Sequence, residues 1–147
     1  MSNYTDTVAA LGKLFAQTTR GTLDASEVMM VLESGAKKII HYFKSSTTSN
    51  DEVIYTFVAP VDMTFKAGLA DSAAEAGTGA TAESILSLKT DGGAAWGTIT
   101  FAAAGTTGTF AAAADEEVAA GSLVTIVAPA SADASLADIA FSLVGYA

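Results

Sequence analysis

The 147-residue chain contains no cysteine, one histidine, two prolines and one tryptophan. The absence of cysteine excludes a disulfide framework and a thiolate zinc site, and it leaves the redox compartment undetermined. The single imidazole, His41, has no serine or carboxylate near it at triad-like spacing, and no nucleophile-elbow motif accompanies it. We therefore expect a protein that is not an enzyme and that uses no cofactor.

Long apolar runs and basic groups are also scarce. No stretch approaches the roughly 18–20 apolar residues of a membrane span, and the first residues do not look like a secretory signal. Residues 51–147 hold twelve acidic side chains against Lys66 and Lys89, and no basic residue follows Lys89. Such an acidic surface repels nucleic acid and anionic membranes. We expect a protein that is made in a cytoplasm and binds neither.

What the chain does contain is alanine, which supplies about thirty of its residues. Each buried alanine removes little apolar area from water, at about 25 cal/mol per Å². A single copy is then only moderately stable, which favours oligomerisation.

Residues 1–44 are interpreted as a helical segment for anchoring or oligomerisation. Apolar residues at helical spacing predict one helix over Thr5–Gln17, and Asp24 or Ser26 with Glu27 can begin a second. The segment either packs on the rest of its own chain or docks on a partner. Residues 38–44 either continue the helix or form a first strand, and their β-branched and aromatic content favours the strand. The candidate docking or oligomer contacts are Val8, Leu11, Phe15, Val28, Leu32, Ile39 and Phe43.

Residues 45–51 are polar and read as a linker, whereas residues 52–147 show the alternation of short strands. Asp91-Gly92-Gly93 is a strong hairpin signal, because such turns require a positive φ. Residues 67–81 read as a Gly/Ala-rich connection, and the whole region predicts seven or eight strands. The expected fold is therefore mainly β: an antiparallel β-sandwich of jelly-roll type, preceded by a short helical N-terminal segment.

Residues 52–146 resemble a β-sandwich module of tailed-bacteriophage virion proteins, which is appended to head fibres, capsid decoration proteins and tail components. The shared motifs are F-x-x-P, S-L-K-x-x-G, G-T-I-T-F, T-T-G-T-F and A-G-x-L-x-x-x-V-A-P, at residues 57–60, 87–92, 97–101, 106–110 and 120–129. Ser122 replaces the aspartate that usually follows the glycine of the last motif, and residues 111–114 are unusually alanine-rich. The motifs are structural, and residues 1–50 lie outside the resemblance.

The resemblance implies a structural virion protein, either a capsid decoration (cement) protein or a head-fibre subunit. Its expected partners are the major capsid protein or another virion protein, and sister copies, with a homotrimer favoured. The alternative is a tail-fibre or baseplate module that binds host-surface carbohydrate through the candidate exposed aromatics Trp96 and Tyr146. A hydrolase remains a third class, with His41 as its only candidate base. The acidic run Asp115–Glu117 lacks the spacing of a calcium loop, and we expect no metal site.

Overall fold

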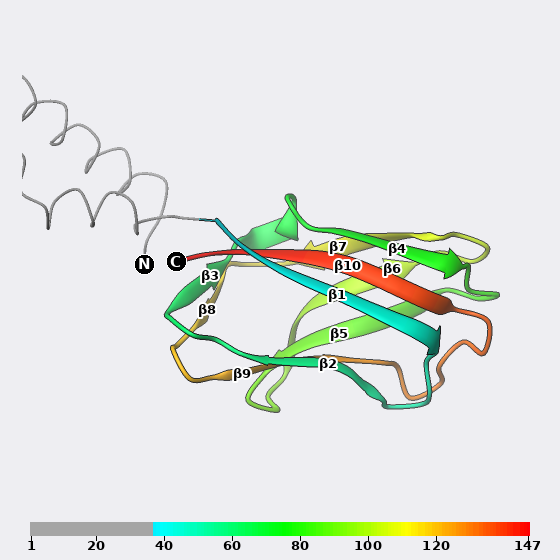
Figure 1. Ribbon diagram of the computed structural model, residues 1–147, viewed down its shortest axis with the longest axis horizontal. Coiled ribbons are helices and arrows are strands. Elements are labelled where there is room, and N and C mark those ends of the chain that lie inside the picture. Colours follow the sequence, from blue (N-terminus) through cyan, green and yellow to red (C-terminus); the bar gives the residue numbers. More distant parts are fainter. Residues whose placement is uncertain (1–36) are drawn as a thin grey trace, which may run out of the picture.

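The structure is a computed structural model that describes residues 37–147 (Figure 1). The two predicted helices lie outside the described residues. So do five of the predicted contacts, namely Val8, Leu11, Phe15, Val28 and Leu32.

The described part of the chain is mainly β and antiparallel, as predicted. Its strands form one sheet in the order β2-β9-β5-β6-β7-β4-β10-β3-β8, and β1 pairs with β10. A short 3-10 turn, η1 (Ala67–Leu69), follows β3. The strands are β1 (Lys37–Thr47), β2 (Val53–Val58), β3 (Met63–Phe65), β4 (Ala73–Thr78), β5 (Ser84–Thr90), β6 (Ala95–Phe101), β7 (Thr107–Ala112), β8 (Glu116–Val118), β9 (Leu123–Val127) and β10 (Ala137–Tyr146).

The alternation of apolar and polar residues determines which face of each strand is buried. Leu86 and Leu88 on β5 are completely buried, and so are Ile99 and Phe101 on β6, whereas the residues between them are partly or fully exposed. The hairpin that joins β5 to β6 is confirmed, since Asp91 and Gly92 both have positive φ. One face of the sheet thus encloses a single apolar core.

The sheet curls so that strands distant in its order meet over this core. Tyr42 on β1 and Tyr55 on β2 lie 4.7 Å apart between ring centroids, and both rings also contact Phe141 on β10. Figure 1 shows β1 and β10 crossing one side of the molecule and β2 and β9 the other. The outer faces of β1 and β10 consequently point away from the core.

The structure confirms one prediction about the bounds of the elements and corrects others. Residues 38–44 belong to a strand, as favoured, but β1 continues to Thr47, so the predicted linker 45–51 is wrong for its first three residues. The expected connection 67–81 contains β4, where Ala74 and Ala76 are buried. Residues 52–147 hold nine strands rather than seven or eight.

One carboxylate fastens the loop that precedes β10. Asp133 accepts hydrogen bonds from the Thr81 hydroxyl (2.6 Å), the Ala82 N–H (2.9 Å) and both the N–H and hydroxyl of Ser135 (2.9 and 2.6 Å). The Leu136 N–H adds a fifth bond at 3.2 Å. These donors, led by the Ser135 hydroxyl, hold the pKa of Asp133 far below its usual range.

We predict that Asp133→Asn lowers the melting temperature at neutral pH, because an amide cannot accept all five bonds. A depressed pKa contributes stability above the ordinary value of 3.8 and loses it as the pH falls through the folded-state value. The difference between the variant and the wild type should therefore be constant above pH 5 and narrow only below 3.8. Thermal unfolding between pH 7 and pH 2 measures this, with Asp138→Asn as the control. Equal losses in both variants would contradict the assigned role.

Candidate functional site

The outward face of β1 carries Phe43, which is the most exposed of the large hydrophobic side chains in the described part of the chain. Phe43 is 62% exposed and Ile39 is 54% exposed. Their neighbours Ile40 and Tyr42 point the other way and pack against the core. Because side chains alternate along a strand, β1 is anchored by one set of apolar residues and presents another to the outside. Two of the predicted contacts, Ile39 and Phe43, are therefore accessible on the surface.

A hollow of about 470 Å³ lies beside these side chains on the outer surface of the sheet. Strand β10 runs between β1 and β4, and it places Ala140 opposite Phe43 and Ser142 opposite His41. On the far side of β10, Glu75 lies opposite Ala140 and Ala73 opposite Ser142. The hollow forms because β10 and β4 carry small side chains at these positions, whereas the larger Phe43 side chain on β1 lies at its edge. We call this surface of β1, β10 and β4 the outer face.

The outer face also brings together a histidine and a serine that sequence spacing did not connect. His41 Nδ1 and Ser142 Oγ lie 2.8 Å apart, although the residues are 101 positions apart in the chain. A hydroxyl beside an imidazole is the first pair of a nucleophilic triad. Within residues 37–147, however, no carboxylate is hydrogen-bonded to His41. The pair thus has a base and a hydroxyl but lacks an orienting third group among the described residues.

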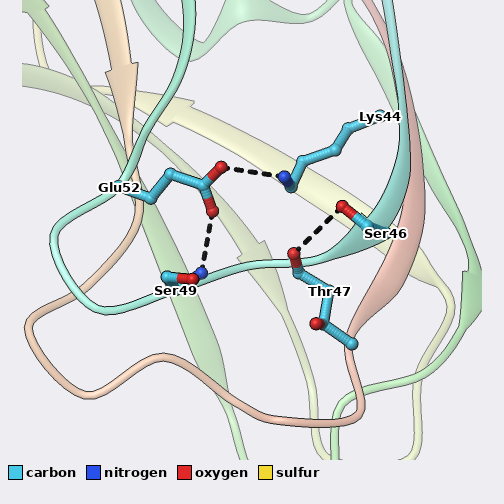
Figure 2. A network of polar contacts seen from close by, with 5 residues as sticks. All are labelled: Lys44, Ser46, Thr47, Ser49 and Glu52. Carbon is cyan, nitrogen blue, oxygen red and sulfur yellow. Dashed lines mark hydrogen bonds and ion pairs between the residues drawn. The ribbon is translucent and has the colours of Figure 1, made fainter.

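The end of β1 is held to the turn that follows it by an ion pair (Figure 2). Lys44 Nζ lies 2.8 Å from Glu52 Oε1, and the Ser49 N–H donates to Glu52 Oε2 at 2.8 Å. Both side chains are less than a third exposed. The bond from Lys44, followed by the one from Ser49, lowers the pKa of Glu52. This contact joins β1 to the residue that immediately precedes β2, and the tyrosines of these two strands meet over the core.

We predict that Glu52→Gln destabilises the protein by about 1 kcal/mol at pH 7, since it leaves the Lys44 ammonium with a neutral partner. A lowered pKa gives stability above the ordinary value of 4.5, so the difference should shrink as the pH falls below that value. Urea unfolding at a series of pH values measures it. The exposed Glu117→Gln serves as the control, and an undiminished difference at pH 2.5 would refute the ion-pair account.

The two candidate aromatics for glycan binding are half-buried rather than exposed. Trp96 stacks on Phe65 with 5.2 Å between centroids and an interplanar angle of 25°, and its Nε1 donates to Thr90 Oγ1 at 3.0 Å. The register of β5 and β6 shifts between Leu88 and Lys89, which explains why Trp96 packs against the core instead of following Thr98 outward. Trp96 therefore does not form the open stacking platform that sugar binding requires.

Tyr146 belongs to a polar cluster at the other end of β10. Its hydroxyl donates to Asp71 Oδ2 at 2.5 Å, and Lys37 Nζ lies 2.8 Å from the same oxygen. The hydrogen bond to Asp71 raises the pKa of Tyr146, and the bond from Lys37 is the main reason that the pKa of Asp71 is lowered. These contacts join the first and last described strands to the loop before β4, which is a structural use of the phenol.

The acidic run that begins at Asp115 is partly neutralised within the fold. Asp115 accepts from Lys66 Nζ and from the Ala67 N–H, both at 2.8 Å. No group of three or more histidine, aspartate or glutamate side chains in residues 37–147 is arranged to hold a metal ion. In the same part of the chain, no helix has the length and apolarity needed to cross a bilayer.

Sequence reasoning identified Ile39 and Phe43 but not the hollow beside them. Ala73, Ala140 and Ser142 have small side chains that give no functional signal, and only the pairing of β1, β10 and β4 brings them together. The chain matches no known protein-family model, and it shows no significant sequence similarity to any curated protein. The function has to be argued from the site.

Proposed function

We propose that this chain is a structural subunit of a tailed-bacteriophage virion, acting as a capsid decoration protein or head-fibre subunit. The observation that carries the proposal is the apolar outer face, where Ile39 and Phe43 are more than half exposed beside the hollow. An apolar surface of this kind marks an interaction site. The resemblance of residues 52–146 to virion modules supplies the setting.

The proposed task is to reinforce the shell by contact. Residues 1–36 lead directly into β1, so their predicted apolar stripe and the outer face belong to neighbouring parts of the chain. Burial of such side chains against shell subunits contributes about 25 cal/mol per Å², repeated over every copy. The remainder of the domain is acidic and projects from the particle, where like charge keeps particles apart.

We also propose that the curled sheet is a sandwich of jelly-roll type. Three contacts across the core support this arrangement: Tyr42 with Tyr55, Tyr55 with Phe141, and Phe57 with Phe65. In the proposed sandwich, β1, β10 and β4 form one layer, and β2, β9 and β5 form the other. An experimental structure in which these two sets of strands lie side by side in one flat layer would refute it.

Binding to empty phage shells tests the function. β1 is fully paired with β10, so a truncation that removes residues 1–44 would take away most of a strand of the fold. The informative truncation removes residues 1–36 only. We expect the labelled full-length protein to co-sediment with shells and the truncated protein, verified as folded by circular dichroism, to lose occupancy. Full occupancy by the truncated protein would refute anchoring through residues 1–36. A full-length protein that binds neither the shell nor any other virion part would refute the virion role.

A further inference from the structure

The two tyrosines that meet over the core form the closest aromatic pair of the described residues. Tyr42 on β1 and Tyr55 on β2 have 4.7 Å between their ring centroids and planes tilted by 40°. The other aromatic pairs of residues 37–147 are 5.1–6.5 Å apart. The separation of the tyrosines is thus at the short end of the roughly 4.5–7 Å range of aromatic contacts. Two phenols held so close together are placed to react with each other.

The surroundings hold both rings in place without competing for such a reaction. Phe141 on β10 contacts both tyrosines, at 5.1 Å from the Tyr42 ring and edge-on at 5.7 Å from the Tyr55 ring. A phenylalanine ring has no hydroxyl, so it orients the tyrosines but cannot become a phenoxyl radical. Both tyrosines are partly rather than fully buried. Burial raises the pKa of the Tyr42 phenol, and the Tyr55 phenol adds to this rise, as expected of two hydroxyl groups close to each other.

A bond between these rings would fasten a strand that has few other attachments. In the described part of the chain, β10 is the only strand with which β1 pairs. β1 and β2 are consecutive, but no backbone ladder joins them. They are connected by residues 48–52, by the Lys44–Glu52 ion pair and by the contact between the tyrosine rings. Ion pairs and ring contacts open when an edge strand frays, whereas a covalent bond does not.

We propose that Tyr42 and Tyr55 are an oxidative cross-linking site, at which a one-electron oxidant joins the two rings and fastens β1 to β2. The oxidant removes one electron from each phenol, and each phenolic proton passes to water. The unpaired electron of each radical is shared with the ring carbons next to the oxygen, so one such carbon from each ring can form a carbon–carbon bond. The hydrogen on each joined carbon then shifts to the oxygen and restores the phenol. The net change is the loss of two hydrogen atoms, and it does not depend on the virion role.

Photo-oxidation of the dilute, full-length protein tests the site. Illuminated tris(bipyridyl)ruthenium(II) removes the electrons singly, and one persulfate takes up both of them and leaves two sulfate ions. We expect dityrosine fluorescence and a product with the mass of one chain less two hydrogen atoms. Trypsin cuts after Lys44, between the two tyrosines, so the unfolded product should yield peptides 39–44 and 45–66 joined together. A one-chain product that lacks this joined peptide would overturn the proposal, and so would the absence of any dityrosine.

Phenylalanine variants separate this pair from the chain's other tyrosines, Tyr4 and Tyr146. Tyr55→Phe keeps the packed ring but removes the phenol, and we expect it to lower the yield of the one-chain cross-link about ten-fold or more. The matched control is Tyr146→Phe, which also loses only a hydroxyl, one that is bonded to Asp71 and lies outside the pair. After circular dichroism has shown both variants to be folded, the control should give the wild-type yield. Equal yields from the two variants would overturn the proposal.

Hydrogen exchange measures whether the bond fastens β1. We expect the amides of Lys37–Thr47 to exchange several-fold more slowly in the cross-linked protein, because β1 can no longer separate from β2 when it opens locally. The amides of Thr107–Ala112 on β7, which lies between β6 and β4 in the sheet, should slow less. Unchanged exchange of the β1 amides would show that the bond forms without fastening the strand, and it would refute the proposed role.

Discussion

Replacement of Phe65 with alanine is expected to lower the free energy of unfolding by about 3–5 kcal/mol, the range for a large aromatic removed from a core. Phe65 is fully buried on the short strand β3. It stacks on Trp96 and meets Phe57 edge-on at 6.5 Å between centroids. Removal of the ring leaves a cavity in the core. Because β3 is only three residues long, it offers few other side chains to fill this cavity, and the surrounding side chains will relax only in part. Guanidinium unfolding measures the loss, and the fluorescence of Trp96, the chain's only tryptophan, should shift with it.

The chain supplies its own control for this substitution. Phe43→Ala removes the same ring from a side chain that is 62% exposed, so its effect on the stability of an isolated copy should stay within about 0.5 kcal/mol. Both variants are measured at a concentration low enough to keep the chain monomeric. Similar losses from the two would mean that β3 does not cover the core as described.

Gly108→Ala is the second substitution with a large expected effect, although it adds only one methyl group. A Cβ at this position on β7 would lie 2.8 Å from both Ala74 Cβ and Phe101 Cζ, and 3.0 Å from Ile99 Cγ2. Two of these neighbours, Phe101 and Ile99, are completely buried and cannot move aside. We expect a loss of about 1–3 kcal/mol, typical of an overpacked core.

Gly145→Ala provides the comparison: its new methyl group would lie 2.8 Å from Met63 Cε, the end of a flexible side chain, and 3.0 Å from Cε1 of the buried Phe65 ring, whereas every close neighbour at position 108 is a short or rigid side chain. A methionine thioether can adopt another rotamer, so the loss should be smaller than at position 108. Chemical unfolding of both variants under the same conditions decides the order. A larger loss at position 145 would show that the core around β7 is looser than the structure describes.

The sequence predicted most strands because their residues are bulky and alternate. Val53 to Val58 and Trp96 to Phe101 carry β-branched and aromatic side chains at a period of two, and both form strands. Strand β4 reads AAEAGT, residues of low β propensity, and only its pairing with β10 and β7 makes it a strand. Tertiary hydrogen bonding, which composition does not reveal, determines such an element.

The site was predictable only where a single side chain carried the signal. Ile39 and Phe43 were identified because they belong to the apolar stripe of the N-terminal segment, which predicted docking or oligomer contacts. His41 and Ser142 were not connected, since their 2.8 Å contact depends on the register between β1 and β10. Trp96 was placed outward because strict alternation cannot anticipate the irregularity between Leu88 and Lys89.

The pairing of β1 with β10 also determines when the domain can finish folding. Lys37 lies opposite Tyr146 and Phe43 opposite Ala140, so each of these partnerships closes a loop of roughly a hundred residues. During synthesis, β1 leaves the ribosome well before the only strand with which it pairs in the described part of the chain. In the meantime Ile40 and Tyr42 have no core to enter. Pairing between such distant residues slows folding to milliseconds or longer. Until β10 is synthesised, β1 exposes apolar side chains that promote aggregation, so we expect expression of the folded protein to depend on chaperones.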